Sequence, residues 1–441
     1  MRRSRVTIRK SIAALSIGLA VSGSALAATE IQFWHAMTGA LGERVGSIAE
    51  RFNASQSDYE VVPVFKGNYD ETLSAGIAAF RAGNPPHILQ VFEVGTATMM
   101  AADRAIKPVH EVMASGGQKF DPSVYIPSVS GYYTSSSGQM LSMPFNSSTT
   151  VFYYNKDAFR AAGLDPDQAP VTWADVARAA GTLKAAGVDC PYTTGWQSWV
   201  HLENLSAWHD VPFASHENGF GSTKAELKFN SPLHVRHIDM LAQWAKDGWF
   251  SYAGRKSEGE AKFYGGQCAM LTSSSAAYAN IARNAKFEFW VAQLPYHSDV
   301  AGAPRNTIIG GASLWVMAGK KADDYKGVAQ FFGFMSSPEI QAEWHQGTGY
   351  LPITAAASTL TEQQGFYQQK PGTDTSVKQM TSREPTANSK GIRLGNFVQI
   401  RGVIDEELEA VWAGNKSAKE ALDTAVRRGD ELLRRFEKTA G

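Results

Sequence analysis

Cysteine is scarce in this chain: Cys190 and Cys268 are the only two among 441 residues. Two thiols so far apart in sequence are too few for a zinc site. In an oxidising compartment they can form one bridge that closes a long loop. The sequence leaves this open against two buried free thiols, because it does not give their separation in space. We expect no metal and no cofactor.

An excess of positive charge is also missing. The full chain has 42 Lys and Arg residues against 42 Asp and Glu residues. Residues 1–27 contain five basic residues and no acid, so the rest of the chain carries 37 basic against 42 acidic residues, a net charge of −5. This balance argues against nucleic acid or an anionic membrane surface as a partner.

Apolar runs of membrane-spanning length are missing too. The run from Ile12 to Val21 is too short to span a bilayer. It follows a basic start and precedes the small residues Ala25-Leu26-Ala27, which is the pattern of a cleavable secretory signal peptide. Residues 1–27 are therefore predicted to be a signal peptide cleaved before Ala28. No cysteine follows to carry a lipid, so the mature protein is expected to be exported and soluble.

Enzyme signatures are largely absent. The sequence has no Gly-x-Ser-x-Gly elbow, Walker loop, dinucleotide fingerprint or His-Glu-x-x-His motif. His234 and His237 have helical spacing, but without a third ligand they are interpreted as a solvated surface pair. Glu406 and Glu407 are expected to serve a helix dipole. An exported phosphodiester or glycan hydrolase stays as an alternative, because two carboxyls facing each other across a cleft leave no spacing signature.

What the sequence does contain is an alternation of strands and helices. Strand patterns at 31–35, 59–65 and 88–94 are separated by amphipathic helical patterns at 41–52 and 69–81. This order predicts an α/β fold with a mostly parallel sheet covered by helices on both faces. At this length two lobes are favoured over one oversized domain.

Later segments indicate how the lobes are connected. The polar runs Met143–Thr150 and Gly347–Pro352 are interpreted as crossings between lobes. A strand is expected over Thr307–Met317, broken by Gly310-Gly311. Gln363–Asn388 is polar and poor in regular patterns, which predicts a surface excursion.

The stretch Gly265–Asn284 has a pattern typical of an anion cradle. An apolar strand of four residues leads into Thr272-Ser273-Ser274-Ser275, after which Ala276–Asn284 is helix-prone. Free N–H groups and the positive dipole end of a helix attract anions, and serines there both cap and donate. The alternative is a plain N-cap.

Polar and aromatic residues also gather where strands end, and in open α/β sheets ligands bind beyond the carboxyl ends of the strands. A ligand cleft between lobes is favoured over packing alone. The residues concerned are Trp34, His35, Tyr69, Glu93, Trp196, Trp199 and Tyr350.

Several segments together resemble a known family over nearly the whole mature chain. The segments are Phe33–His35, Lys66–Tyr69, Leu89–Thr96, Pro144–Ser148, Gly195–Trp199, Ile308–Ser313, Thr348–Pro352, Leu394–Asn396 and Gln399–Arg401. They resemble the periplasmic glycerol-3-phosphate-binding proteins of Ugp-type ABC importers. These belong to the extracellular solute-binding proteins, a group that includes maltose-binding protein.

The resemblance implies a two-lobed periplasmic-binding-protein fold of type II, with a hinge and a ligand cleft between the lobes. It implies a first lobe from 28–145 plus 276–347 and a second from 146–275 plus 348–441. The protein is then expected in the periplasm, as a monomer without catalytic activity. It would bind sn-glycerol-3-phosphate, with glycerophosphodiesters as further candidates, and deliver it to ABC permease subunits.

The resemblance also implies the ligand contacts, which are Tyr69, Glu93, Ser148, Ser274, Gly311, Tyr350 and Arg401, with Trp196 and Trp199 lining the pocket. Arg401 offers a planar fork for phosphate oxygens. Glu93 repels phosphate and is expected to accept from the glycerol hydroxyls at the far end. Gly311 lets a backbone N–H approach closely.

Two alternatives are left open by the residues themselves. Arg401 can instead pair on the surface with Glu406 or Glu407. Trp196 and Trp199 suit the faces of a sugar equally well, so a sugar or oligosaccharide carrier is the main rival function.

Overall fold

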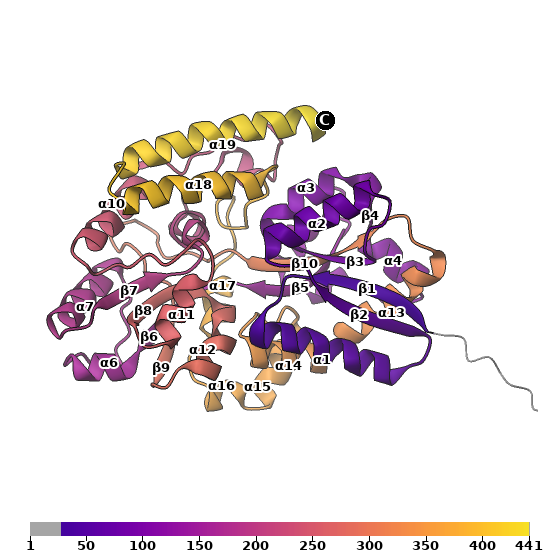
Figure 1. Ribbon diagram of the computed structural model, residues 1–441, viewed down its shortest axis with the longest axis horizontal. Helices are drawn as coiled ribbons and strands as arrows, with labels where there is room; N and C mark the ends of the chain where they lie inside the picture. Colours follow the sequence, from indigo (N-terminus) through magenta and orange to yellow (C-terminus); the bar gives the residue numbers. More distant parts are fainter. Residues whose placement is uncertain (1–27, 441) are drawn as a thin grey trace, which may run out of the picture.

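The strands form two separate sheets in the computed structural model, which describes residues 28–440 (Figure 1). In the first sheet the strand order is β2 (Tyr59–Phe65), β1 (Thr29–His35), β3 (Ile88–Phe92), β10 (Gly310–Met317) and β4 (Ile106–Lys107), with β5 (Met143–Ser148) paired to the start of β10. Strands β2, β1 and β3 are parallel, as the predicted β-α-β-α-β order requires, whereas β10 runs antiparallel to β3. The predicted signal peptide lies outside the described residues.

The second sheet has the order β7 (Cys190–Thr194), β8 (Cys268–Ser274), β6 (Thr150–Asn155) and β9 (Phe289–Ala292). We call the halves built on the two sheets the first lobe and the second lobe. The predicted two-lobed α/β fold is therefore confirmed. Strand β9 falls within the range 276–347 that was predicted for the first lobe, yet it pairs with β6 in the second sheet. That predicted boundary is wrong for this strand, because backbone pairing overrides its position in the sequence.

Helices cover the first sheet on both faces, with α2 and α3 on one side and α1 on the other (Figure 1). The helices of this lobe are α1 (Gly39–Ser55), α2 (Tyr69–Arg81), α3 (Thr96–Ala101), α4 (Val109–Ser115), α5 (Pro127–Tyr133), α13 (Ala322–Met335) and α14 (Pro338–Thr348). Helix α14 starts as its sequence indicates, since Ser337 caps it and Pro338 occupies the first turn.

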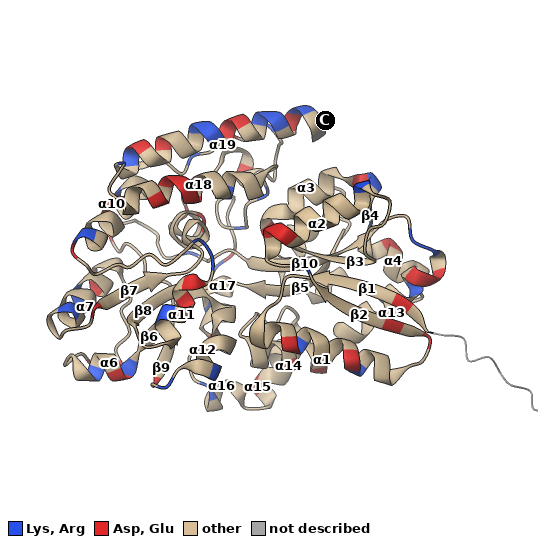
Figure 2. Ribbon diagram, in the orientation of Figure 1, with Lys and Arg blue, Asp and Glu red and all other residues tan. Residues whose placement is uncertain are grey.

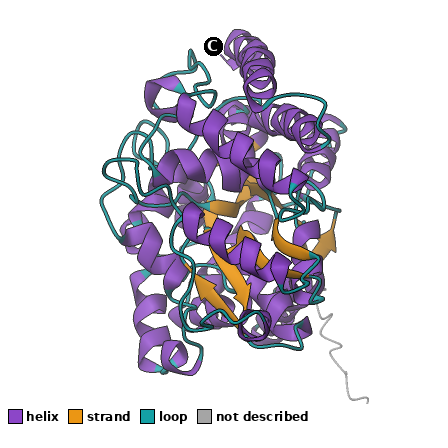
Figure 3. Cartoon of the chain, turned by 90° about the vertical axis from the view of Figure 1, so that its left-hand side faces the viewer, coloured by secondary structure: helices purple, strands orange, loops and turns teal. Residues whose placement is uncertain are grey.

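In the second lobe, helices enclose the strands on several sides (Figure 3). Its larger helices are α7 (Trp173–Ala185), α10 (Pro232–Lys246), α11 (Glu258–Tyr264), α18 (Phe397–Trp412) and α19 (Ala418–Ala440). The shorter helices of the chain are α6 (Lys156–Ala161), α8 (Leu205–Trp208), α9 (Ser215–Asn218), α12 (Tyr278–Asn284), α15 (Ala355–Gln363), α16 (Phe366–Gln369) and α17 (Thr375–Thr381). Thr172 caps α7 through a reciprocal capping box with Asp175.

The chain passes from the first sheet to the second between Ser148 and Thr150, where β5 ends and β6 begins. The other predicted crossing, Gly347–Pro352, is wrong: it connects α14 to α15, and Tyr350 and Leu351 pack in the apolar core of the first lobe. The predicted break of the last strand at Gly310-Gly311 is also wrong, because β10 begins at Gly310.

The polar segment 363–388 lies largely at the surface, as its composition predicted, but it contains regular structure that its sequence did not indicate. It contains α16 and α17, and Gln379 is buried against the strand that leaves the crossing. The side chain of Gln379 accepts from the Leu294 N–H at 3.1 Å and donates to the carbonyl of Thr150. A run of polar residues in the sequence predicts exposure, so it does not identify a buried amide whose hydrogen bonds are made by distant groups.

Cys190 and Cys268 form a disulfide, which decides the alternative that the sequence left open. They face each other as a registered pair on the parallel strands β7 and β8. Strand pairing brings together residues separated by 78 positions.

Replacing both cysteines with serine is expected to lower the free energy of unfolding by about 2–4 kcal/mol, because the bridge restricts a long loop in the unfolded chain. Urea unfolding of the wild type and of Cys190→Ser/Cys268→Ser measures this loss. The wild type in reductant serves as the control and should shift by a similar amount. Equal midpoints for oxidised wild type and variant would contradict the prediction.

Charged residues are dispersed over the outer surface. Lys, Arg, Asp and Glu alternate along α19 and are scattered over the other outer helices (Figure 2). Among residues 28–440, no helix combines the length and apolarity needed to cross a membrane.

Candidate functional site

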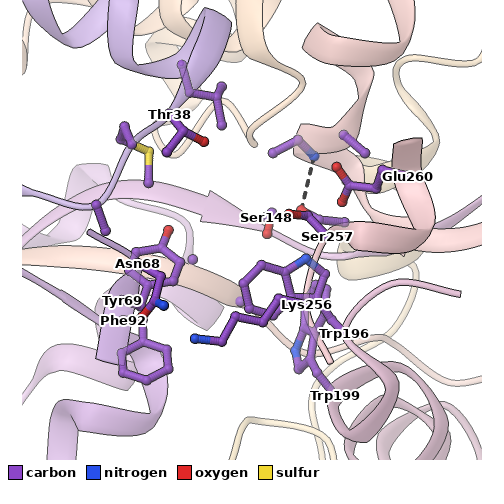
Figure 4. A pocket seen from close by; sticks show the side chains of 18 of the residues that line it. Thr38, Asn68, Tyr69, Phe92, Ser148, Trp196, Trp199, Lys256, Ser257 and Glu260 are labelled. Carbon is purple, nitrogen blue, oxygen red and sulfur yellow. Dashed lines mark hydrogen bonds between the residues drawn. The ribbon is translucent and has the colours of Figure 1, made fainter. Parts of the chain in front are cut away.

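A cavity of about 280 Å³ lies between the two lobes, lined by side chains from both (Figure 4). It brings together residues that are spread over more than 300 positions of the sequence. All nine residues predicted as ligand contacts or pocket walls border it: Tyr69, Glu93, Ser148, Trp196, Trp199, Ser274, Gly311, Tyr350 and Arg401. Their roles toward a ligand stay predictions.

Tyr69 forms the first-lobe wall, and the start of α2 fixes its position. The Asn68 side chain accepts from the Glu71 N–H at 3.1 Å, while Glu71 accepts from the Asn68 N–H at 2.7 Å. This capping box sets where the helix begins. The Tyr69 ring stacks on Phe92 with centroids 5.1 Å apart, and its hydroxyl accepts from Asn146 Nδ2 at 2.8 Å. Burial raises the pKa of Tyr69 well above its usual value, so the phenol is neutral and can donate to a ligand.

Arg401 lies on α18, is 8% exposed and forms ion pairs with two carboxylates. Its Nε and Nη2 donate to the two carboxylate oxygens of Glu203 at 2.9 and 2.8 Å, and Nη2 also donates to Glu93 at 2.7 Å. Burial alone would lower the pKa of Arg401, but the two carboxylates raise it above its usual value. Within the described residues Nη1 has no hydrogen-bond partner, so it is the part of the fork left for a ligand.

This arrangement corrects two expectations about Arg401. Glu93 accepts a hydrogen bond from the Arg401 guanidinium. The expectation that Glu93 and Arg401 bind opposite ends of the ligand is therefore wrong, because their charged groups are in contact. The surface alternative is excluded, because Arg428 on α19 pairs with Glu406 at 2.7 Å and Glu407 at 3.0 Å.

Glu203 is the residue that sequence reasoning missed. It is 1% exposed and lies in a π-helical turn, Trp199–Asn204. The available signal was a single carboxylate within the largely apolar run Trp199–Trp208. A carboxylate in such a run must be either paired or neutral.

The serine turn at the end of β8 has features of both alternatives that its sequence allowed, the anion cradle and the plain N-cap. Ser274 Oγ accepts from the Ala276 N–H at 3.1 Å, which is an ordinary cap. Ser273 does not border the cavity, and its Oγ donates to Glu260 at 2.7 Å. Ser274 and Ala276 nevertheless border the cavity, so the cradle is narrower than predicted.

Gly311 lies opposite this turn, on β10, with φ of +93°. It pairs with Ser147 next to the crossing, and a Cβ at this position would lie 1.8 Å from the Asn146 carbonyl oxygen. Glycine is therefore required by both backbone conformation and close approach. The irregularity in the pairing of β5 with β10 occurs between Ala312 and Ser313, so the pairing is regular at Gly311.

The two tryptophans close the second-lobe side of the cavity (Figure 4). Trp199 is buried, and its indole N–H has no hydrogen-bond partner within residues 28–440. At the mouth, Lys256 pairs with Asp70 on α2. With the Arg401–Glu93 contact, this ion pair links the lobes across the cavity.

His234 and His237 do not form the predicted surface pair, because both are fully buried. His237 shares hydrogen bonds with His201 Nδ1 at 3.0 Å and His297 Nε2 at 3.1 Å. Burial lowers the pKa of His237 well below its usual value, so the ring is neutral and packs as core. In the part of the chain that the structure describes, no group of three or more His, Cys, Asp or Glu residues could hold a metal ion.

Comparisons with known proteins agree with this architecture. Residues 47–375 match the profile of the bacterial extracellular solute-binding protein family. The chain is 58% identical over 427 residues to the sn-glycerol-3-phosphate-binding periplasmic protein UgpB of Escherichia coli, covering 97% of each chain. It is 56% identical over 436 residues to the UgpB of Salmonella paratyphi A, covering 99% of each.

Solved structures show the same fold at low sequence identity. UgpB from Mycobacterium tuberculosis in complex with glycerophosphocholine superposes with a TM-score of 0.77 at 20% identity, covering 92% of this chain and 99% of that one. Maltose-bound MalE3 of T. maritima gives 0.75 at 16% identity with the same coverage. The chain is a member of the bacterial extracellular solute-binding protein family.

Proposed function

We propose that this protein is the periplasmic solute-binding component of an ABC importer and that its ligand is sn-glycerol-3-phosphate. It holds the ligand in the cavity between the lobes and delivers it to the permease subunits without chemical change. We expect it to act as a monomer.

The observation that carries this proposal is the composition of the cavity wall. It combines a guanidinium nitrogen without a protein partner, two serine hydroxyls, two phenols and a glycine backbone, and these come from both lobes. Charge-assisted donors of this kind recognise phosphate. The name carried by relatives that are 56–58% identical over nearly the full chain supports the same ligand.

Binding between lobes explains why the ligand favours closure. Donors on both lobes contact one guest only when the lobes approach, so the closed state gains contacts that the open state lacks. The Arg401–Glu93 and Lys256–Asp70 contacts form across the same gap. Glu203 lies in the same lobe as Arg401, so it keeps the guanidinium oriented whichever way the lobes move.

Isothermal titration calorimetry on ligand-stripped protein tests the proposal. We expect sn-glycerol-3-phosphate to bind one to one, and maltose to give no heat. Glycerophosphocholine is the third arm and shows whether a diester fits. Tight binding of maltose without binding of glycerol-3-phosphate would overturn the proposal in favour of a sugar carrier. Release of free choline on prolonged incubation with glycerophosphocholine would instead indicate a hydrolase.

A further inference from the structure

One buried carboxyl group in the cavity is not explained by the predicted contacts. Glu260, in the first turn of α11, borders the cavity and is 6% exposed. Its side chain points toward the same space as Ser148 (Figure 4). One carboxyl oxygen, Oε1, accepts from Ser273 at 2.7 Å. The Trp196 side chain also donates to this carboxyl group, whose second oxygen, Oε2, has no hydroxyl or cationic donor among the described residues.

No cation compensates Glu260 within the described residues. Lys256 pairs with Asp70, Lys262 donates to a serine hydroxyl at 3.0 Å, and Arg401 already carries two carboxylates. A buried carboxylate without a cation is costly, and the cost is lower when the group is neutral.

The groups that face Glu260 from neighbouring elements supply no positive charge that would stabilise its ionised form. The groups that face it are Glu258 on α11, Ser273 on β8, Trp196 in the loop after β7, and the phenols of Tyr153 on β6 and Tyr350 after α14. Arg283 on α12 pairs with Glu43, so it does not neutralise Glu260. Burial raises the pKa of Glu260 to about 7, against the lowering effect of hydrogen bonds from Ser273 and Trp196. Burial likewise raises the pKa of both phenols, which stay neutral.

A ligand with two negative charges makes the ionised form of Glu260 still more unfavourable. The cavity already contains Glu93, Glu258 and Glu260 against Arg401 and Lys256. An ionised Glu260 beside the two serines would repel a phosphate dianion, since opposing like charges in a desolvated site cost several kcal/mol. A neutral carboxylic acid at the same place is a hydrogen-bond donor instead.

We propose that Glu260 contacts the phosphoryl group as a neutral carboxylic acid, donating a hydrogen bond from Oε2 to a phosphate oxygen, so that one proton is taken up from solvent with each ligand. This inference rests on the proposed function, because it requires a phosphorylated ligand. It makes Glu260 a ligand contact in addition to those predicted from the sequence, and it makes binding proton-coupled.

Calorimetry at about pH 8 tests the proton directly, because a phosphate monoester with a second pKa near 6 is already a dianion there. Titrations of glycerol-3-phosphate in two buffers of different ionisation enthalpy give the number of protons bound. We expect about one proton per ligand for the wild type. From about pH 8 to 9 its affinity should fall by up to about tenfold, because the proton must be supplied against rising pH.

Glu260→Gln keeps the size of the side chain and supplies an amide donor that does not titrate. We expect it to bind with no proton uptake and with little change in affinity over the same pH range. Glu362→Gln is the control, since Glu362 on α15 is an exposed carboxylate that does not border the cavity. It should behave like the wild type.

The outcomes separate this inference from the proposed function. Glycerol-3-phosphate that binds wild type without proton uptake would overturn the role of Glu260 and leave the function standing. Uptake that persists in Glu260→Gln would also overturn it, because another group would then carry the proton. Failure of the wild type to bind glycerol-3-phosphate at all would overturn both.

Discussion

Arg401→Ala is expected to weaken glycerol-3-phosphate binding by about 2–5 kcal/mol, which is about 30-fold to several thousand-fold. The variant removes the charged donor and leaves Glu93 and Glu203 buried without a cation. Any negative charge that remains on this pair repels a phosphate. The same loss should lower the free energy of unfolding by about 3–5 kcal/mol, as for other broken buried ion pairs. Calorimetry and urea unfolding measure the two effects separately.

The stability loss in Arg401→Ala should depend on pH with a definite sign. In the wild type, burial already raises the pKa of Glu93, and Arg401 opposes that rise. Without Arg401 the folded-state pKa rises further above its unfolded value, so the folded state binds more protons than the unfolded state near neutral pH. Stability then increases as the pH falls. We expect the deficit relative to wild type to be smaller at about pH 5 than at about pH 8.

Arg428→Ala is the matched control for this experiment. Arg428 also pairs with two glutamates away from the cavity, the exposed Glu406 and the buried Glu407. It should leave ligand affinity unchanged and cost less stability than Arg401→Ala, because Glu407 keeps Lys416 as a partner. Retention of wild-type affinity within about threefold in Arg401→Ala would contradict a role for the guanidinium in binding.

Gly311→Ala is expected to lower both stability and ligand affinity. A non-glycine residue in the left-handed region costs about 1–2 kcal/mol. The new Cβ would in addition lie 1.8 Å from the carbonyl oxygen of Asn146, so β5 and β10 must move apart. Because Ser148 ends β5 and Gly311 borders the cavity, that movement displaces two walls of the site. We expect a total stability loss above about 2 kcal/mol and at least tenfold weaker binding.

Gly302→Ala separates the two causes. Gly302 has φ of +83°, and a Cβ there would meet no heavy atom within 4 Å. It should show only the conformational cost of about 1–2 kcal/mol and no change in affinity. Equal stability losses in Gly302→Ala and Gly311→Ala would show that contact with β5 is unimportant.

Local features of the fold were predictable because their causes are local. Helix α2 begins at Tyr69 since Asn68 and Glu71 are three positions apart and cap each other. Strand β2 has its predicted bounds, and α7 and α14 start where Thr172 and Ser337 cap their first turns. Local patterns singled out Tyr69, Glu93, Ser274, Trp196, Trp199 and Tyr350 as candidates, whereas Ser148, Gly311 and the binding role of Arg401 came only from the resemblance to a family.

Features that depend on burial were mispredicted. Gln379 in the polar segment 363–388 and the histidines of α10 are polar residues for which the sequence predicted exposure, yet they are buried and satisfied by distant partners. Sequence polarity reports the cost of burial but not the presence of a partner that offsets it. The same reason explains why Glu203 was missed.

The order of residues by itself determined the parallel β-α-β-α-β start, the positions of helix caps and, through its resemblance to a family, the two-lobed architecture. Only the tertiary structure decided that the cysteines are bonded, that β9 joins the second sheet and that Arg401 lies between two carboxylates. The physical reason is range: caps and periodicity act over a few residues, whereas strand pairing and charge compensation depend on which distant groups folding brings within a few ångströms.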